Sequence, residues 1–400
     1  MSAPIWSDGH LTLYGGDCRA VLAELPAESV NCVVTSPPYF GLRDYGTAAW
    51  DGGDEACDHA GPPKASTSST LKNDGRPSER VGQNDYERAA VVPFRDTCGK
   101  CGAVRIDSQL GLEPTPEAYV ESMVAVFREV RRVLRKDGTL WLNLGDSYAN
   151  DGKWGGSSGG KHVTALHGDS GVGRRKQHTG LKPKDLVGIP WRVAFALQAD
   201  GWYLRSDIIW AKPNPMPESV TDRPTKAHEY LFLLSKSPRY YYDAEAVRET
   251  ALWPDGPNSP GSIALPYGQG FTRKADKQRA SAAASAPSTE RRMAWFNDRW
   301  DASEANGTAP TGRNLRTVWT IATEPYPGAH FATFPRKLVE PCVKAGCPEG
   351  GTVLDPFAGS GTTLLVAQAL GRRGVGIDLN PDYLRQALER NRQTPLGLVG

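Results

Sequence analysis

A hydroxyl group, two prolines and an aromatic ring follow directly on a short apolar run. The run covers residues 30–34, and Ser36, Pro37, Pro38 and Tyr39 come after it. It has the length of a buried strand, and two consecutive prolines can neither continue a strand ladder nor begin a helix. We therefore expect a stiff turn that places a hydroxyl and a free carbonyl beside an aromatic face. At the carboxyl end of a strand, where open α/β sheets bind ligands, this turn could hold a planar base with an exocyclic amine.

A second candidate site is a glycine-rich turn between a short strand and a helix. It runs from Asp355 to Thr363, and Gly359 and Gly361 permit a tight turn and close approach of the backbone to a ligand. The pattern is not G-x-G-x-x-G, and no lysine stands where a phosphate-binding loop requires one, so nucleoside triphosphate binding is disfavoured. Asp378 ends the next strand, where a carboxylate can bind ribose hydroxyls. A well-packed turn with a surface aspartate is the alternative, but the combination favours a cofactor that contains a nucleoside.

Four potential metal ligands lie in a polar stretch without periodic apolar residues. They are Cys57, His59, Cys98 and Cys101, and a glycine follows the last of them. Cys-x-x-Cys-Gly is the spacing of a knuckle that wraps thiolates around Zn²⁺, so we expect a structural Cys₃His zinc site in an insertion at 52–107. Zinc would stabilise a segment that lacks an apolar core of its own. Free surface thiols and an exposed histidine are the alternative.

The elements that must position these residues alternate as in an α/β fold. Thr115 and Pro116 form a helix start signal, and residues 136–138 predict a turn between that helix and the next strand. A helix, a turn and a buried strand in succession indicate a unit of a parallel sheet. Apolar runs predict strands at 11–14, 30–34, 139–144, 204–210, 229–234, 352–354 and 374–377, and three-four spacing predicts helices at 18–25, 118–134, 190–200, 334–343 and 364–370.

The bulk properties limit the class of protein. The chain has 400 residues, which accommodate one large domain with insertions or two domains, and a formal net charge of only +2. Affinity for a polyanion would therefore have to come from local basic segments, such as residues 161–184 and 271–316. No apolar stretch approaches the ~20 residues that span a bilayer, and no secretion signal is recognisable. The chain has seven cysteines, an odd number that fits reduced thiols or metal ligands better than a disulfide framework. The sequence therefore predicts a cytoplasmic protein.

Several segments resemble blocks of the amino-directed DNA methyltransferases. Residues 355–363 resemble their S-adenosylmethionine-binding motif and Thr35–Tyr39 their catalytic motif, and further similar blocks are 139–146, 209–212, 223–230 and 330–335. The catalytic motif comes first, which is the circularly permuted order of the β group. The resemblance implies a Rossmann-like, mixed and mostly parallel sheet with helices on both faces. It also implies a catalytic domain at 1–51, 108–243 and 316–400 and a target-recognition region at 244–315.

The resemblance further implies roles for single residues. Ser36, Pro37, Pro38 and Tyr39 would be catalytic: Ser36 Oγ and the Pro37 carbonyl would accept hydrogen bonds from an exocyclic amine, and Tyr39 would stack on the base. Cofactor binding is implied for Asp17, His330, Phe334, Asp355, Phe357, Gly359, Gly361, Thr362 and Asp378. Asp17 has a turn-forming residue as its alternative interpretation. His228 and Glu229 are left out of the predicted catalytic site because a pair at the edge of the core explains them equally well.

The first residue of the catalytic motif indicates the target base. In the family that the chain resembles, serine usually accompanies N4-cytosine methylation, and aspartate or asparagine usually accompanies N6-adenine methylation. The expected function is direct in-line transfer from S-adenosylmethionine to N4 of a cytosine flipped out of double-stranded DNA, with adenine N6 as the alternative. An RNA or protein amide methyltransferase is less favoured because its Asn-Pro-Pro-Tyr motif normally follows the cofactor motif. A non-catalytic DNA-binding module is disfavoured by two intact motifs, and a restriction endonuclease partner and a homodimer are compatible with the expected function.

Overall fold

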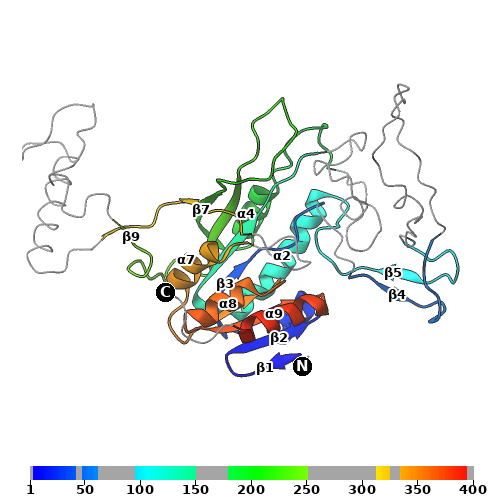
Figure 1. Ribbon diagram of the computed structural model, residues 1–400, viewed down its shortest axis with the longest axis horizontal. Helices are drawn as coiled ribbons and strands as arrows, with labels where there is room; N and C mark the ends of the chain where they lie inside the picture. The colour runs from blue at the N-terminus through cyan, green and yellow to red at the C-terminus, as the bar shows by residue number, and fades with distance from the viewer. Residues whose placement is uncertain are drawn as a thin grey trace, which may run out of the picture. The chain divides into compact units, whose positions relative to one another are not determined.

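The computed structural model describes residues 3–41, 47–61, 94, 96–149, 179–250, 312–324 and 334–393. These residues form a nine-stranded sheet in the order β1-β2-β13-β12-β3-β6-β8-β7-β11 (Figure 1). The strands are β1 (Trp6–Ser7), β2 (Leu11–Gly15), β3 (Val30–Thr35), β6 (Leu134–Leu144), β7 (Tyr203–Ala211), β8 (His228–Ser235), β11 (Val318–Thr320), β12 (Thr352–Asp355) and β13 (Arg373–Asp378). Strands β2, β13, β12, β3 and β6 pair in parallel, whereas β8 is antiparallel to both β6 and β7. The sheet is therefore mixed and mostly parallel.

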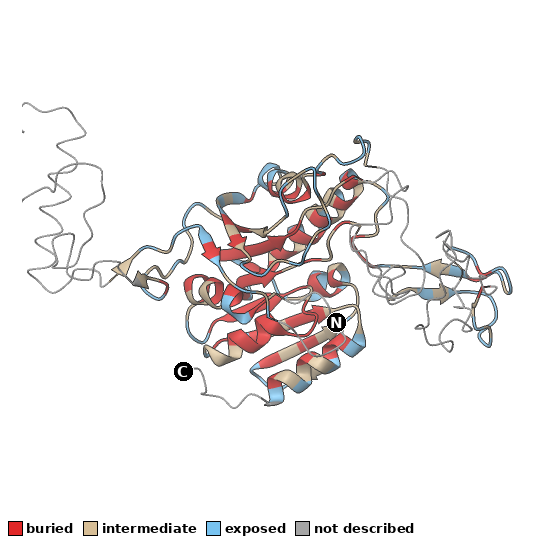
Figure 2. Ribbon diagram, turned by 45° about the horizontal axis from the view of Figure 1, so that its top comes forward, coloured by how far each residue is buried: buried red, intermediate tan, exposed pale blue. Residues whose placement is uncertain are grey.

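Helices cover both faces of the sheet. They are α1 (Cys18–Glu24), α2 (Pro116–Val133), α4 (Ile189–Ala199), α7 (Arg336–Gly346), α8 (Thr362–Ala369) and α9 (Pro381–Gln393). Helix α2 packs against α1 and α4, and α8 packs against α7 and α9. Figure 2 shows the strands as the most continuously buried part of the molecule. The predicted fold class is confirmed.

Helix α2 illustrates how the sequence forms this core. The Thr115 hydroxyl caps the helix by accepting a hydrogen bond from the Ala118 N–H at 3.1 Å, and Pro116 occupies the first turn. The buried side chains recur at three-four spacing and are all fully enclosed: Tyr119, Met123, Val126, Phe127, Val130 and Val133. The apolar stripe therefore faces the sheet and the charged residues face away from it.

The predicted turn at residues 136–138 is wrong. Helix α2 already ends at Val133, and β6 begins at Leu134 and includes Asp137 and Gly138. The pairing of β6 with β3 shifts register here, so the extra residues form an irregularity in the strand instead of a turn before it. A Cβ on Gly138 would lie 2.5 Å from the Leu134 side chain, which explains the need for glycine.

The described chain divides into two units, residues 1–242 with 317–400 and residues 243–316. In the second unit, β9 (Glu249–Thr250) and β10 (Gly312–Arg313) form a two-stranded sheet. Arg313 and Arg316 were candidates for phosphate contact, and both form ion pairs with Glu249, at 2.7 and 3.0 Å. The unit spans almost the same residues as the predicted target-recognition region, whose role stays a prediction.

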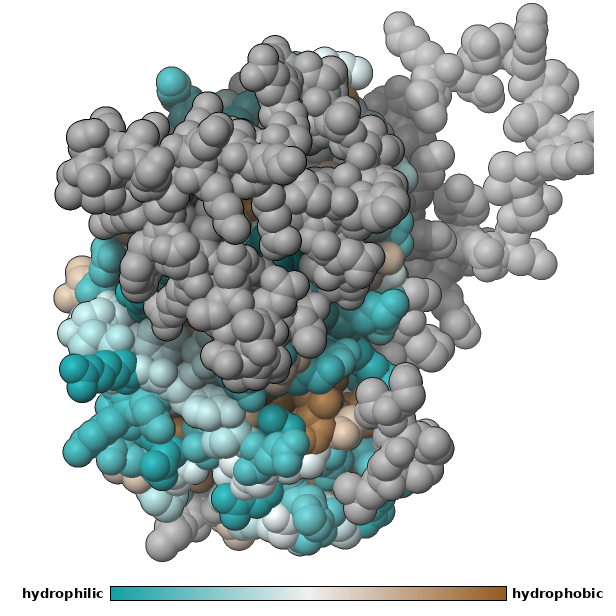
Figure 3. Space-filling model, turned by 90° about the vertical axis from the view of Figure 1, so that its left-hand side faces the viewer, coloured by the Kyte–Doolittle hydropathy of each residue, from teal (hydrophilic) through white to brown (hydrophobic). Residues whose placement is uncertain are grey.

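The surface is mainly hydrophilic on the face drawn in Figure 3, apart from a small apolar area among the described residues. No helix in the described part of the chain has both the length and the apolar character to cross a bilayer. A separate two-stranded sheet, β4 (Ala49–Asp51) with β5 (Val104–Ile106), belongs to the segment that carries the predicted metal ligands.

Candidate active site

The predicted catalytic turn lies at the carboxyl end of the central strand β3. Ser36 follows the last residue of that strand, and the strand lies between β12 and β6. The Pro38 carbonyl accepts a hydrogen bond from the Tyr119 hydroxyl at 2.8 Å, which fixes the turn to α2. The Pro37 carbonyl accepts no hydrogen bond from any described residue, so it is available to a ligand.

A buried carboxylate joins this turn to the glycine-rich turn. Asp355 ends β12 and is 1% exposed, and its Oδ1 accepts a hydrogen bond from Thr35 Oγ1 at 2.6 Å. Its Oδ2 accepts a hydrogen bond from Thr363 Oγ1 at 2.8 Å, and the Phe357 N–H donates to Oδ1 at 3.1 Å. Burial raises the pKa of Asp355 to about 6. The two predicted motifs are thus adjacent, although the chain separates them by more than 300 residues.

The glycine-rich turn is shaped by the next strand. Asp378 ends β13, and its carboxylate accepts hydrogen bonds from the N–H groups of Gly359 and Asn380, both at 2.8 Å. Burial raises the pKa of Asp378 to about 6. Gly361 has a φ of 76°, and a Cβ there would lie 2.7 Å from Ala387 on α9. This close packing brings the start of α8, at Thr362, next to the turn.

The site fits a nucleoside-containing cofactor by the chemistry of its donors and acceptors. A carboxylate offers about four acceptor positions, and the half-buried Asp378 uses at most three of them for backbone N–H groups. It therefore has room for a ribose hydroxyl. The carboxyl end of the strands also provides the start of a helix, where N–H groups point outward.

The remaining predicted cofactor residues are Asp17, Phe334 and His330. Asp17 accepts a hydrogen bond from the Arg19 N–H at 2.8 Å as the N-cap of α1, and it also forms an ion pair with the Arg19 side chain. It is close in the fold to Asp378, because Gly16 donates to the Asp378 carbonyl at 3.0 Å. Phe334 lines a small cavity together with Thr35, whereas His330 lies outside the described residues.

Tyr39 is surrounded by a polar network that the sequence patterns did not predict. The Tyr39 hydroxyl contacts Glu229 Oε2 at 2.7 Å and Asn143 Oδ1 at 3.0 Å, and Lys212 forms an ion pair with Glu229. Burial, and then the Glu229 charge, raise the pKa of Tyr39 well above its usual value, so the phenol stays protonated. The signal was present, because these three partners lie in the blocks that resemble the methyltransferases.

The four predicted metal ligands come together. Their ligand atoms all lie within 4.8 Å of one another. The Cys57 and Cys98 sulfurs are 3.8 Å apart, and Cys101 Sγ is 3.5 Å from His59 Nδ1. Tetrahedral zinc with Zn–S bonds of ~2.3 Å requires sulfurs about 3.8 Å apart, so the cluster fits zinc. Backbone hydrogen bonds at Asp54 and Ala103 lower the pKa of Cys101 to about 6, which favours the thiolate.

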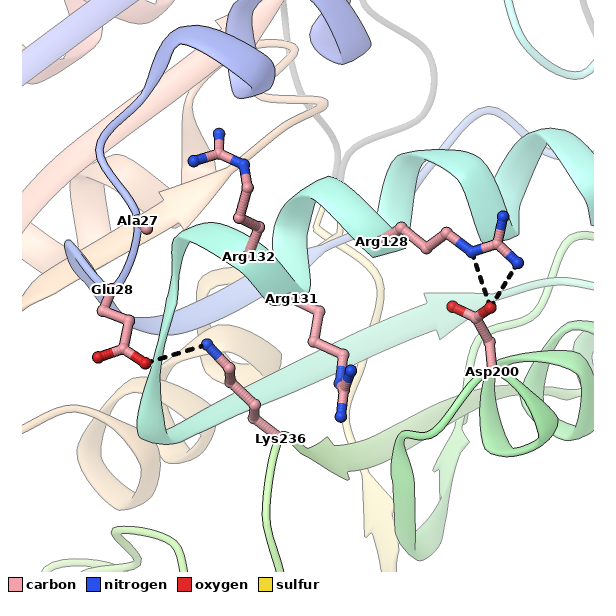
Figure 4. Close-up of a pocket in the computed structure, with 7 residues that line it drawn as sticks. All are labelled: Ala27, Glu28, Arg128, Arg131, Arg132, Asp200 and Lys236. Carbon is pink, nitrogen blue, oxygen red and sulfur yellow. Dashed lines mark hydrogen bonds and ion pairs between the residues drawn. The ribbon is translucent and has the colours of Figure 1, made fainter.

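A cavity of about 580 Å³ lies away from these groups (Figure 4). It is at the amino ends of β3 and β6 and contains the ion pairs of Arg128 with Asp200 and of Lys236 with Glu28. Because parallel strands have their ligand sites at the opposite, carboxyl edge, this cavity is not part of the candidate active site.

Comparison with known proteins decides the family. Residues 30–389 match the family model described as DNA methylase, which covers N6 and N4 enzymes. The chain belongs to this DNA methylase family. It is 40% identical over 380 residues to the Type II methyltransferase M.SmaI of Serratia marcescens, covering 94% of this chain and 88% of that protein. It is 39% identical over 390 residues to the Type II methyltransferase M.Cfr9I of Citrobacter freundii, covering 97% and 90%.

One similar solved structure is the PvuII DNA methyltransferase, which is described as cytosine-N4-specific. The match covers 97% of this DNA methylase and 88% of that chain, with a TM-score of 0.49 and 16% sequence identity. The family assignment rests on the sequence matches. It confirms the predicted resemblance: this DNA methylase is an S-adenosylmethionine-dependent, amino-directed DNA methyltransferase.

Proposed function

We propose that this enzyme methylates N4 of cytosine in double-stranded DNA at a specific site. The observation that carries the proposal is the position of Ser36, one residue beyond the Thr35–Asp355 hydrogen bond of 2.6 Å that ties the catalytic turn to the cofactor turn. A serine hydroxyl is neutral and suits a target amine that must lose its proton only after methyl transfer. Adenine N6 is the second candidate, because the family includes both kinds of enzyme.

The proposed mechanism depends on positioning. An exocyclic amine is a poor nucleophile because its lone pair is delocalised into the ring. Hydrogen bonds from the amine to Ser36 Oγ and to the unpaired Pro37 carbonyl would draw the nitrogen towards a tetrahedral geometry and stabilise the positive charge that develops on it. Bound S-adenosylmethionine supplies an electrophilic methyl group. Tyr39 would stack on the base, which must be flipped from the duplex at a cost of a few kcal/mol.

The same proposal assigns the cofactor-binding residues. Asp378 would bind the ribose, and the turn from Asp355 through Phe357, Gly359 and Gly361 to Thr362 would enclose the methionine end. Phe334, which contacts the same cavity as Thr35, would close the other side. Asp17 would act next to Asp378, and His330 is assigned by the motif alone.

Analysis of nucleosides by mass spectrometry tests the proposal directly. DNA incubated with the enzyme and labelled S-adenosylmethionine is digested and analysed for modified nucleosides. N4-methylcytosine is the expected product. N6-methyladenine would replace the proposal by its alternative, and label in RNA or protein but not in DNA of varied sequence would reject both.

We further propose that Cys57, His59, Cys98 and Cys101 bind structural Zn²⁺. Four protein ligands leave no open position for catalysis, so the ion would stabilise residues 52–107. Residues 243–316 are proposed to recognise the DNA sequence. A cytoplasmic location, a cognate restriction endonuclease and a homodimer remain predictions of the sequence.

A further inference from the structure

Glu229 and Lys212 form a largely buried ion pair behind the catalytic turn. Each side chain is 17% exposed. Glu229 lies at the start of β8, which runs opposite to β6 and β7, and Lys212 follows the end of β7. Both side chains therefore stand at the edge of the sheet where β3 ends. The ammonium group of Lys212 also lies 4.2 Å from the ring centre of Trp210, so it is held from two sides.

The network around Tyr39 has a fixed direction. The Asn143 side chain donates to the Tyr230 carbonyl at 3.1 Å, which turns its oxygen towards the Tyr39 hydroxyl. Glu229 Oε2 and Asn143 Oδ1 are both positioned as acceptors for the Tyr39 hydroxyl, so its single proton is directed to these two neighbours. Tyr39 therefore cannot donate to Ser36. Its oxygen accepts instead, and Ser36 Oγ lies 3.4 Å away as the donor.

The direction of these hydrogen bonds determines whether the Ser36 hydroxyl can accept a hydrogen bond from a ligand. Once its proton points to Tyr39, the lone pairs of Ser36 Oγ are free for an N–H group of the target amine. The contact of 3.4 Å is long, as is common for catalytic hydrogen bonds before the substrate binds. The Tyr39 ring itself is confined, because a Cβ at Gly145 would lie 2.4 Å from it.

We propose that Glu229 is a positioning residue that, through the phenol of Tyr39, sets the Ser36 hydroxyl as a hydrogen-bond acceptor for the target amine. Lys212 holds the Glu229 carboxylate in place through their ion pair. The inference rests on the proposed function, in which Ser36 contacts the amine. It adds a residue that touches neither the base nor the cofactor.

Two nearly isosteric variants test the direction of the network. In Glu229→Gln, the Lys212 ammonium group donates to the amide oxygen, so the amide NH₂ faces Tyr39. The hydrogen bond between residue 229 and the Tyr39 hydroxyl is thereby reversed. Tyr39→Phe keeps the ring and the Glu229–Lys212 pair but breaks the connection to Ser36. Each should lower kcat about tenfold, the effect of one hydrogen bond to a charged group. The KM for DNA, the Kd for S-adenosylmethionine measured by calorimetry and the flipping signal of 2-aminopurine at the target position should not change.

The double variant and a matched control complete the test. Because both changes act through one path, Glu229→Gln with Tyr39→Phe should be no slower than Tyr39→Phe alone. Glu218→Gln is the control, since Glu218 also forms an ion pair, with Arg223 at 2.8 Å and 22% exposed, but has no contact with Tyr39. It should keep the wild-type kcat.

The outcomes separate this inference from the proposed function. Wild-type kcat in Tyr39→Phe and Glu229→Gln, with Ser36→Ala inactive, would overturn the inference and leave the catalytic role of Ser36 intact. Additive losses in the double variant would also overturn it. If Ser36→Ala retained full activity, the amine contact that the proposed function assigns to Ser36 would be wrong, whereas the modified nucleoside would still decide the target base. Should Glu229→Gln not fold, Tyr39→Phe decides alone, because it leaves the ion pair in place.

Discussion

In the candidate active site, Ser36 offers a half-buried hydroxyl and Asp355 an enclosed carboxylate. Ser36 has no side-chain partner other than Tyr39 among the described residues, at 3.4 Å, so it can exchange partners when a base arrives. Asp355 accepts three hydrogen bonds from its own fold. It therefore holds the two turns together.

Replacing Ser36 by alanine should lower kcat by about 100-fold, as loss of one preorganised group at a developing charge commonly does. S-adenosylmethionine should bind with unchanged affinity, because the Ser36 side chain forms no hydrogen bond with the described residues of the glycine-rich turn. Single-turnover methylation and calorimetry measure the two effects. Full activity in this variant would show that the amine contact is wrongly assigned.

Stability should fall as the pH rises from about 4 to about 6 because of the buried carboxyls. The pKa of Asp355 is raised from 3.8 to about 6, so its contribution is fully present below the unfolded pKa and is lost as the pH passes the folded one. The loss is up to ~3 kcal/mol per group, and Asp378 adds a similar contribution. In Asp355→Asn, the free energy of unfolding measured with urea should change with pH about half as steeply as in the wild type.

The control for this experiment is Asp382→Asn, because Asp382 is 64% exposed and pairs with Arg385 within its own helix. It should keep the wild-type slope. An unchanged slope in Asp355→Asn would mean that this carboxyl is already ionised at low pH in the folded protein.

The packing of helices and strands restricts which residue can occupy certain turn positions. The turn between β12 and α8 packs against α9 so closely that only glycine fits at position 361. Backbone conformation and close packing act together there, whereas at Gly371 only the conformation is special. The two glycines have φ values of 76° and 73°, but nothing lies within 4 Å of a Cβ at Gly371.

Gly361→Ala should destabilise the protein more than Gly371→Ala does. Both variants incur about 1 kcal/mol for the left-handed conformation, and Gly361→Ala adds ~1–3 kcal/mol for overpacking against Ala387. It should also weaken S-adenosylmethionine binding, because the turn must shift. Thermal unfolding and calorimetry measure both effects, and equal losses in the two variants would argue against close packing as the cause.

Zinc should be present at one ion per chain and should stabilise the segment that carries β4 and β5. Cys98→Ser should abolish zinc binding and increase proteolysis within residues 52–107, because the segment loses the ion that joins its two halves. Cys18→Ala is the control, since Cys18 is buried in the core outside the cluster and should leave the zinc content unchanged. If elemental analysis found no zinc in the purified protein, the proposed site would be refuted.

At the scale of the molecule, chemistry and sequence recognition are assigned to different units. The proposed catalytic residues all lie in residues 1–242 and 317–400, and the second unit, 243–316, contains none of them. Among its described arginines, Arg248 is paired with Glu245, whereas Arg313 and Arg316 are both paired with Glu249. Phosphate contact by these two arginines would therefore require competition with that acid.

Exchange of residues 243–316 for the corresponding segment of a relative should change the methylated sequence and leave the modified base the same. The physical reason is that the chemistry depends on Ser36 and its network, whereas contacts with base edges decide the sequence. Sequencing of methylated DNA identifies the site, and nucleoside analysis identifies the base. A chimera that keeps the original site would locate recognition elsewhere.

Sequence patterns predicted the fold well wherever the signal was local. The apolar spacing of α2 and the β-prone runs are properties of short segments, and they hold because burial of one face needs no knowledge of the partner. The turn at residues 136–138 failed for the same reason. Asp137-Gly138 is a strong local turn signal, but pairing with β3 and burial of Leu134 outweigh it.

Residue types and spacing were enough to predict the reaction class, the two motifs and a set of four candidate metal ligands, because they carry that chemistry. Which groups meet depends on the tertiary structure. Parallel pairing of β3 with β12 joins Thr35 to Asp355, and antiparallel β8 brings Glu229 to Tyr39. Such contacts depend on strand order and direction, which no local pattern encodes. For that reason Ser36 could be singled out from the sequence, whereas its connection through Tyr39 to Glu229 could not.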